Sequence, residues 1–319
     1  MHEIPTQDCL FVLSRKYEGE SSAVACVRLQ MGYEDFPFTL RLNKVWAAHY
    51  RFSQWWHRTM PEQYNLYLPH QLMPSYQMMA GERRCASVRY MEEGLAAYYT
   101  NSEYAEMFAR PVNWREKIVS TCGYFGKVRR RFDMYPDGRE CYGLTTNSFP
   151  ESTRVKVLTP PALIPLAPDD PSIIIAPKPR LGKIWGEPQV ADLSRGLIEF
   201  CRRRHITEVG IKPHPGEYST TALSARIKKQ LEMAGISVKQ ICQSSWLENH
   251  LMRSESTVIT MGSSIELYGP NFRGAIAYGG LLLSCRQEFC AEYLRSMPQA
   301  ARPLVSRQLA VAAKILGLK

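Results

Sequence analysis

The sequence predicts an α/β protein of two domains. Three observations lead to this prediction: the 319 residues are 45% hydrophobic, short apolar runs alternate with amphipathic stretches, and a proline-rich segment interrupts the alternation. A chain of this length buries its core more readily as two domains than as one. The segment 159–172 holds five prolines and two acids, which regular structure does not tolerate. We therefore expect domains over 1–158 and 173–300, the linker between them, and a C-terminal helix over 301–319.

In the first half, strands and helices alternate. Residues 9–14 form an apolar run typical of a buried strand, and large apolar groups recur at helical spacing over 44–60. Further strands are expected over 63–69 and 85–94, and the second of these ends in two acids and a glycine. The first half is therefore predicted to be an α/β domain.

The second half alternates continuous apolar runs with amphipathic stretches. We expect strands over 172–179, 208–213, 236–242, 256–261 and 274–279, and helices over 190–204, 221–234 and 245–253. Continuous apolar strands separated by helices are typical of a parallel sheet that is covered on both faces. The second half is therefore predicted to be a doubly wound α/β domain.

The composition also restricts the compartment. Nine cysteines are scattered along the chain and never stand two residues apart as in a zinc clip, so we interpret them as free thiols in a reducing cytoplasm. The first residues do not resemble a signal peptide, and the apolar stretch 274–285 is too short to span a bilayer. We expect a cytoplasmic protein that is soluble or peripheral at the inner membrane.

The formal charge of +10 favours anionic partners. Arginine triplets at 129–131 and 202–204 raise the alternative of a nucleic-acid-binding protein, but no aromatic residues interleave with them and no known nucleic-acid-binding motif is present. We therefore expect no nucleic-acid partner. The basic, amphipathic C-terminal helix is expected to pack back across the domains, and peripheral contact with an anionic membrane is its alternative role.

Ligands of open α/β sheets bind beyond the carboxyl ends of the strands, so the residues that follow each strand matter most. The first unusual strand end is Glu92-Glu93-Gly94. Two adjacent carboxylates repel each other, and burial raises the pKa of the less exposed one, which suits a general base. The alternative is a helix start, where acids complement the helix dipole.

The second strand end is His214, which stands between Pro213 and Pro215. The prolines restrict the backbone on both sides, so the imidazole is expected to present one ring nitrogen to a phosphate, with Lys212 adding positive charge. The alternative is an ordinary loop histidine. Lys178, after another strand, is a further candidate for binding an anionic donor, although both lysines are also compatible with ordinary surface positions.

The third strand end is Gly262-Ser263-Ser264, which precedes a helix expected to begin near Ile265. Small residues at a helix N-terminus leave backbone N–H groups open, and two hydroxyls beside them complete a phosphate site. The alternative is that the serines only cap the helix and that Glu266 complements its dipole.

In this order, the three motifs resemble those of the bacterial sialyltransferases and polysialyltransferases of the GT-B fold. The resemblance rests on seven residues: Glu92, Glu93, Gly94, His214, Pro215, Ser263 and Ser264. It implies two Rossmann-like doubly wound domains facing a cleft, with the acceptor on the first domain and the CMP-sugar on the second. It also implies inverting transfer of sialic acid, or a related nonulosonic acid, from its CMP-activated form to a hydroxyl of a glycan or glycolipid acceptor.

The resemblance assigns roles to these residues. Glu92 or Glu93 would take the proton from the acceptor hydroxyl, with Glu92 favoured over Glu93. His214 would assist departure of the CMP phosphate, which Ser263 and Ser264 would bind. The reaction would need no metal or other cofactor, because histidine and helix-terminal N–H groups supply donors for the developing charge.

The nearest rival is a capsule or teichoic-acid type of transferase that uses CMP-Kdo or CDP-glycerol, since such enzymes share the His-Pro and serine-pair features. The acidic pair in the first half favours the sialyltransferase group. The motifs predict recognition of CMP and leave open which nonulosonic acid it carries, which acceptor is used, which linkage forms and whether a polymer is made.

Overall fold

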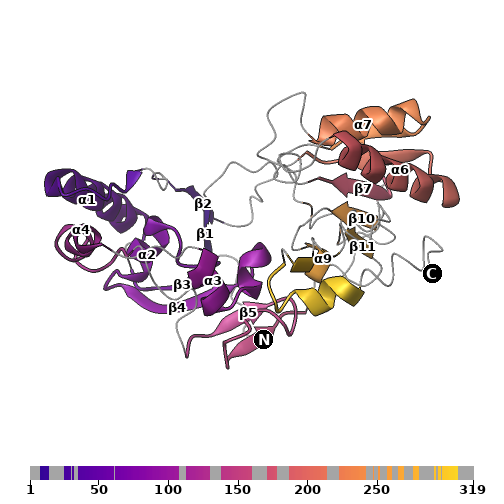
Figure 1. Ribbon diagram of the computed structural model, residues 1–319. Coiled ribbons are helices and arrows are strands. Elements are labelled where there is room, and N and C mark those ends of the chain that lie inside the picture. The colour runs from indigo at the N-terminus through magenta and orange to yellow at the C-terminus, as the bar shows by residue number, and fades with distance from the viewer. Residues whose placement is uncertain are drawn as a thin grey trace. The chain divides into compact units, whose positions relative to one another are not determined.

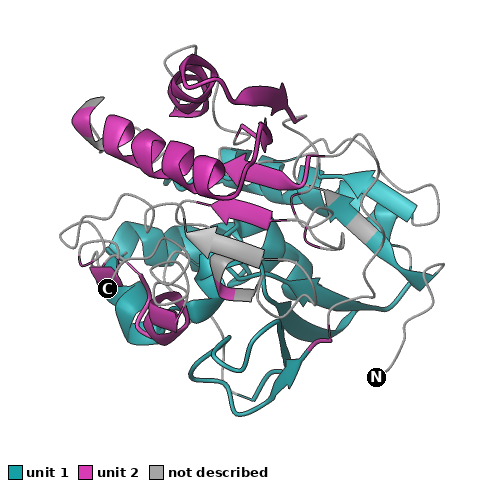
Figure 2. Cartoon of the chain, turned by 90° about the vertical axis from the view of Figure 1, so that its right-hand side faces the viewer, with its two compact units in different colours: residues 1–157 teal, residues 158–319 magenta. Residues whose placement is uncertain are grey.

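The computed structural model divides the chain into two compact units, residues 1–157 and 158–319, coloured separately in Figure 2. The structure describes residues 8–13, 25–29, 31, 35–60, 62–107, 113–129, 138–159, 171–177, 187–213, 223–241, 247, 251, 257–260, 265–268, 276–279, 291, 294–295 and 297–307. The expected linker therefore lies largely outside the described residues. The expected C-terminal helix is described only up to residue 307, where 302–307 are helical.

The first unit contains two parallel sheets (Figure 1). A small sheet joins β1 (Leu10–Leu13) to β2 (Ala25–Arg28). The larger sheet has the order β3-β4-β5-β6. Its strands are β3 (Tyr64–Leu68), β4 (Cys85–Met91), β5 (Cys141–Gly143) and β6 (Val155–Val157). The helical elements are α1 (Leu42–Thr59), α2 (Pro74–Ala80), η3 (Gly94–Tyr98), α3 (Asn101–Met107), α4 (Trp114–Ile118) and η4 (Val119–Gly123).

The core of the first unit lies between α1, α2 and one face of the larger sheet. Strand β3 alternates buried and less buried residues, so that Leu66 and Leu68 point to the same face. Helix α1 is held to this core by Trp56, whose Nε1 donates a 2.8 Å hydrogen bond to the hydroxyl of Tyr64. The same hydroxyl donates to the carbonyl oxygen of Met79 on α2 at 2.6 Å. One buried phenol therefore ties β3 to both helices.

The second unit is built on a parallel sheet of order β11-β10-β7-β8-β9. Its strands are β7 (Ile173–Ala176), β8 (Glu208–Ile211), β9 (Ser237–Gln240), β10 (Thr257–Thr260) and β11 (Ile276–Gly279). The described helices are α6 (Glu187–Arg203), α7 (Leu223–Met233) and α9 (Ile265–Tyr268). The chain extends the sheet from β7 through β8 to β9 and then returns to place β10 on the other side of β7. This is a Rossmann-like strand order, and it reverses between β7 and β10.

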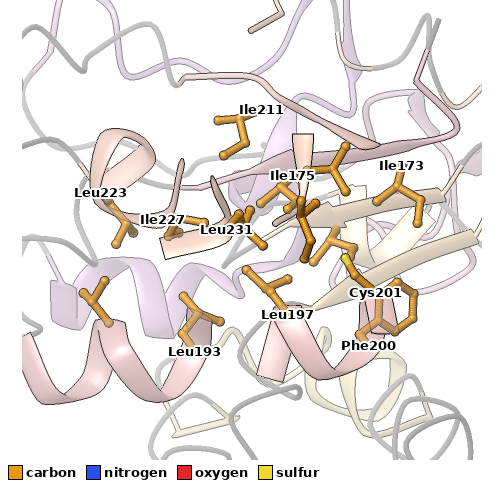
Figure 3. Packing of buried hydrophobic residues seen from close by; sticks show 14 residues of the cluster. Ile173, Ile175, Leu193, Leu197, Phe200, Cys201, Ile211, Leu223, Ile227 and Leu231 are labelled. Carbon is orange, nitrogen blue, oxygen red and sulfur yellow. The ribbon is translucent and has the colours of Figure 1, made fainter. Parts of the chain in front are cut away.

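Helices α6 and α7 cover one face of this sheet. Figure 3 shows Leu193 and Leu197 of α6 and Ile227 of α7 gathered with Ile175 of β7 in one buried cluster. Ile174, next to Ile175 in the strand, points to the opposite face and is also completely buried. A strand buried on both faces explains why β7 reads as a continuous apolar run. The expectation of a mixed α/β chain with parallel sheets is thus confirmed.

Candidate active site

The acidic pair lies at the carboxyl end of β4, where the chain turns into η3. Gly94 has a φ of +77°, a conformation that glycine adopts without the steric cost borne by other residues. Glu93, just before it, is in extended backbone with φ −133° and ψ 90°. Side chains of consecutive residues in extended backbone point to opposite sides. Glu92 and Glu93 therefore have different surroundings although they are neighbours of the same type.

Glu92 points into the first unit and is held by three donors. Its Oε2 accepts hydrogen bonds from the backbone N–H of Leu144 and from Oγ of Ser148, both at 2.6 Å. Its Oε1 accepts one from the hydroxyl of Tyr98 at 2.7 Å. Burial and the Glu92 carboxylate raise the pKa of Tyr98 well above its usual range, so the phenol keeps its proton and donates. Glu92 thus ties η3 to the loop 144–148 that follows β5.

The donors to Glu92 belong to a buried hydroxyl network. Thr145 is 5% exposed and Ser148 1% exposed, and their hydroxyls lie 3.1 Å apart. The hydroxyl of Tyr98 lies 3.2 Å from Oγ1 of Thr145. Gly143 lets this loop fold tightly, because a Cβ at that position would stand 2.6 Å from Cβ of Ser148. The loop is therefore fixed by packing as well as by hydrogen bonds.

Glu93 is exposed, in contrast to the half-buried Glu92. A carboxylate that acts as a base must have room to receive a proton, and proton uptake by Glu92 would weaken the hydrogen bonds that it accepts. The sequence prediction favoured Glu92 as the base. The structure places the Glu92 carboxylate in this hydrogen-bond network and Glu93 on the exposed side of the turn.

His70 is a candidate active-site residue that the sequence analysis did not single out. It follows β3, and because Leu68 of β3 pairs with Tyr90 of β4, it lies at the same sheet edge as Glu92. Nδ1 of His70 accepts a 3.1 Å hydrogen bond from the backbone N–H of Leu72, so the ring proton resides on Nε2. Burial lowers the pKa of His70 to about 4, which keeps the ring neutral at pH 7. The sequence feature that could have indicated His70 is the pair Pro69-His70, which follows the strand expected over 63–69.

In the second unit, the described part of the predicted donor site is Lys212. It directly follows β8, and its backbone N–H donates to the carbonyl oxygen of Ile175 on β7 at 2.9 Å. Its side chain is buried, with the residue only 8% exposed, so it is not an ordinary surface lysine. Lysine is rarely buried to this degree unless it has an anionic or hydrogen-bonding partner.

The other predicted donor-site residues lie outside the described residues: Lys178, His214, Pro215, Gly262, Ser263 and Ser264. The described elements that precede them are nevertheless informative. Lys178 follows β7, the His-Pro pair follows β8, and the serine pair stands between β10 and α9, which begins at Ile265 as expected. Strands β10, β7 and β8 are neighbours in the sheet and run parallel.

Among the described helices, none is long and apolar enough to cross a membrane. Of the described cysteines, Cys85, Cys122, Cys141 and Cys201 are free thiols.

The comparisons with known proteins add little. No protein-family model matches the chain, and no curated protein matches it. A glycosyltransferase of known structure from Rickettsia africae ESF-5 is similar to the chain with a TM-score of 0.34 and 10% identity, over 92% of this chain and 85% of that one. A similarity at this level carries no argument about fold or activity.

Proposed function

We propose that the protein is a glycosyltransferase that moves sialic acid or a related nonulosonic acid from its CMP-activated form to a hydroxyl of a glycan or glycolipid. The proposal includes the GT-B arrangement, with acceptor chemistry on the first unit and CMP-sugar binding on the second. It needs no metal, because the residues assigned to the leaving group supply hydrogen-bond donors and positive charge.

The observation that carries the proposal is the strand order of the second unit. The His-Pro and serine-pair motifs follow β8 and β10, which flank β7 on its two sides. The order reverses between β7 and β10, and ligands of open α/β sheets bind at such a reversal, beyond the carboxyl ends of the strands. Two motifs about fifty residues apart in the sequence therefore follow parallel strands whose carboxyl ends lie at the same edge of one sheet.

In the proposed reaction, the carboxylate of Glu93 takes the proton of the acceptor hydroxyl while the oxygen attacks the anomeric carbon. The bond from that carbon to the CMP phosphate breaks, and its electron pair goes to the phosphate oxygen. His214 donates a proton to this oxygen, while Ser263, Ser264 and Lys212 bind the phosphate. Glu92 keeps its hydrogen bonds to the loop 144–148 and holds Glu93 in its outward position.

The test measures CMP release from three donors side by side: CMP-sialic acid, CMP-Kdo and CDP-glycerol, each in the presence of EDTA. We expect turnover of CMP-sialic acid, and a loss of about 100-fold or more in His214→Ala and in Glu93→Gln. Release from CDP-glycerol alone would refute the proposal. Full activity of His214→Ala would remove this residue from the mechanism.

A further inference from the structure

One surface of the first unit carries large apolar side chains that are exposed and do not belong to the core. It is formed by α1, α4 and the turn after η4, and we call it the α1–α4 surface. Its residues and exposed fractions are Trp46 48%, Tyr50 64%, Trp114 60%, Ile118 38% and Phe125 65%. Single exposed apolar residues are ordinary, but a contiguous group of this kind marks an interaction site.

The members of this surface lie close together. Trp46 and Tyr50 are one turn apart on α1, and Trp114 and Ile118 are one turn apart on α4, so each pair shares a helix face. Nε1 of Trp46 donates a 2.9 Å hydrogen bond to the carbonyl oxygen of Cys122, the residue one turn beyond Ile118. Figure 1 shows α1 and α4 next to each other at one end of the unit.

Phe125 also belongs to this surface, and its backbone has an unfavourable conformation. It has a φ of +51°, which is rare for a bulky residue and indicates strain that the surrounding structure maintains. Its ring lies 5.3 Å from the ring of His49 on α1, edge to face. The turn that contains Phe125 follows η4, a π-helical segment of a kind found frequently at functional sites. A strained turn that presents a phenyl ring to solvent is consistent with a binding role.

The exposed charged residues of the segments that form this surface are all basic. Over residues 35–60 and 113–129, all of which are described, the exposed charged residues are Arg41, Lys44, Arg51, Arg58, Arg115, Lys117 and Arg129. The two acids of these segments, Asp35 and Glu116, are not exposed. The guanidinium of Arg115 lies over the ring of Trp114 on this surface. Lys44, Arg51 and Arg58 recur every seven residues and follow one stripe of α1, on a different side of the helix from Trp46 and Tyr50.

We propose that the α1–α4 surface binds the surface of an anionic lipid bilayer. Tryptophan and tyrosine favour the boundary between headgroups and acyl chains, and basic residues beside them are attracted to anionic lipid. Phe125 and Ile118 would enter the apolar boundary, while the basic residues would contact headgroup phosphates. None of these residues belongs to the expected C-terminal amphipathic helix, and the proposal holds whether or not the chain transfers a sugar.

The test is flotation of the full chain with vesicles of phosphatidylcholine alone and of phosphatidylcholine mixed with phosphatidylglycerol. We expect binding only to the anionic vesicles and a decrease of this binding with added salt. Phe125→Gly and Trp114→Ser should each weaken binding roughly tenfold, because each removes one aromatic group from the apolar boundary. Phe125→Gly is the safer variant, since glycine adopts the positive φ without strain.

The matched control is Met233→Ser, which removes a 72% exposed apolar side chain from α7 of the second unit. It should bind anionic vesicles as the parent chain does. Equal retention of Phe125→Gly, Trp114→Ser and Met233→Ser would overturn the proposal. So would a lipid-free dimer that Phe125→Gly and Trp114→Ser convert to monomer, because the surface would then bind a second copy of this chain. Thermal unfolding of each variant identifies a loss of binding caused by misfolding.

Discussion

Glu92 and Glu93 show how two neighbouring residues of one type can have different surroundings. The sequence contains both acids on one turn. The difference comes from Leu144 and Ser148, more than fifty positions along the chain, whose N–H and hydroxyl groups bind Glu92. The sequence predicts the acidic pair but not the hydrogen bonds that hold Glu92, because these bonds come from a loop far along the chain.

Replacing Glu92 by glutamine should destabilise the first unit. Glutamine has one acceptor oxygen instead of two, so at least one of the three donors that bind Glu92 loses its acceptor, and the charge assistance is also lost. We expect a loss of about 2 kcal/mol in the free energy of unfolding, measured in urea. Glu93→Gln is the control, with a change within about 0.5 kcal/mol. Equal stabilities of the two variants would contradict the structural role of Glu92.

His70 predicts a dependence of stability on pH. Its folded pKa of about 4 lies below the unfolded value of about 6.5, because burial disfavours the charged ring. Below pH 6.5 the unfolded chain takes up a proton that the folded chain refuses, so this contribution to stability is lost as the pH falls toward 4. Between pH 7 and pH 5 the loss should be at most about 2 kcal/mol. Urea unfolding of the parent and of His70→Gln should differ by this pH-dependent amount, and identical profiles would refute the assignment.

At the scale of elements, the sequence predicted the strand that is buried on both faces. It did not predict the strands that have only three residues. Strand β7 was recognisable because three isoleucines are buried on both faces. Strands β5 and β6 have three residues each, too few to show a period, and are defined by pairing with neighbours. Helix α1 was predicted correctly, but its spacing alone did not indicate that Trp46 and Tyr50 face solvent.

The loop after β5 packs tightly where Gly143 meets Ser148, beside Glu92. Gly143→Ala would place a Cβ 2.6 Å from Cβ and 2.8 Å from Oγ of Ser148, closer than real side chains approach. The loop must shift away from Glu92, which should cost about 1–3 kcal/mol of unfolding free energy. Adding Ser148→Gly removes the clash with this side chain together with its hydrogen bonds to Glu92 and Thr145. The double variant should therefore lose less stability than the sum of the single variants, and simple additivity would show that the two positions do not touch.

The contact between α1, β3 and α2 depends on the phenol of Tyr64. Tyr64→Phe leaves the indole N–H of Trp56 and the carbonyl oxygen of Met79 without this partner inside the core. We expect a loss of about 1–3 kcal/mol in a urea titration. Tyr50→Phe is the matched control, since Tyr50 is 64% exposed and should change stability by less than about 0.5 kcal/mol. If Tyr64→Phe lost as little unfolding free energy as Tyr50→Phe, water would have to replace the hydroxyl as the partner of Trp56 and Met79.

At the scale of the whole molecule, the proposed function assigns CMP to the second unit only. A ligand that binds the folded state stabilises it, by about 2.7 kcal/mol at a concentration one hundred times its dissociation constant. We expect CMP to slow amide hydrogen exchange in β7, β8 and β10, whose carboxyl ends precede the donor motifs, and not in β3 or β4. His214→Ala should reduce this protection, while Glu93→Gln should keep it, because the proposed base does not bind the nucleotide. Protection confined to β3 and β4 would place the nucleotide on the first unit and reverse the assignment of donor and acceptor sides.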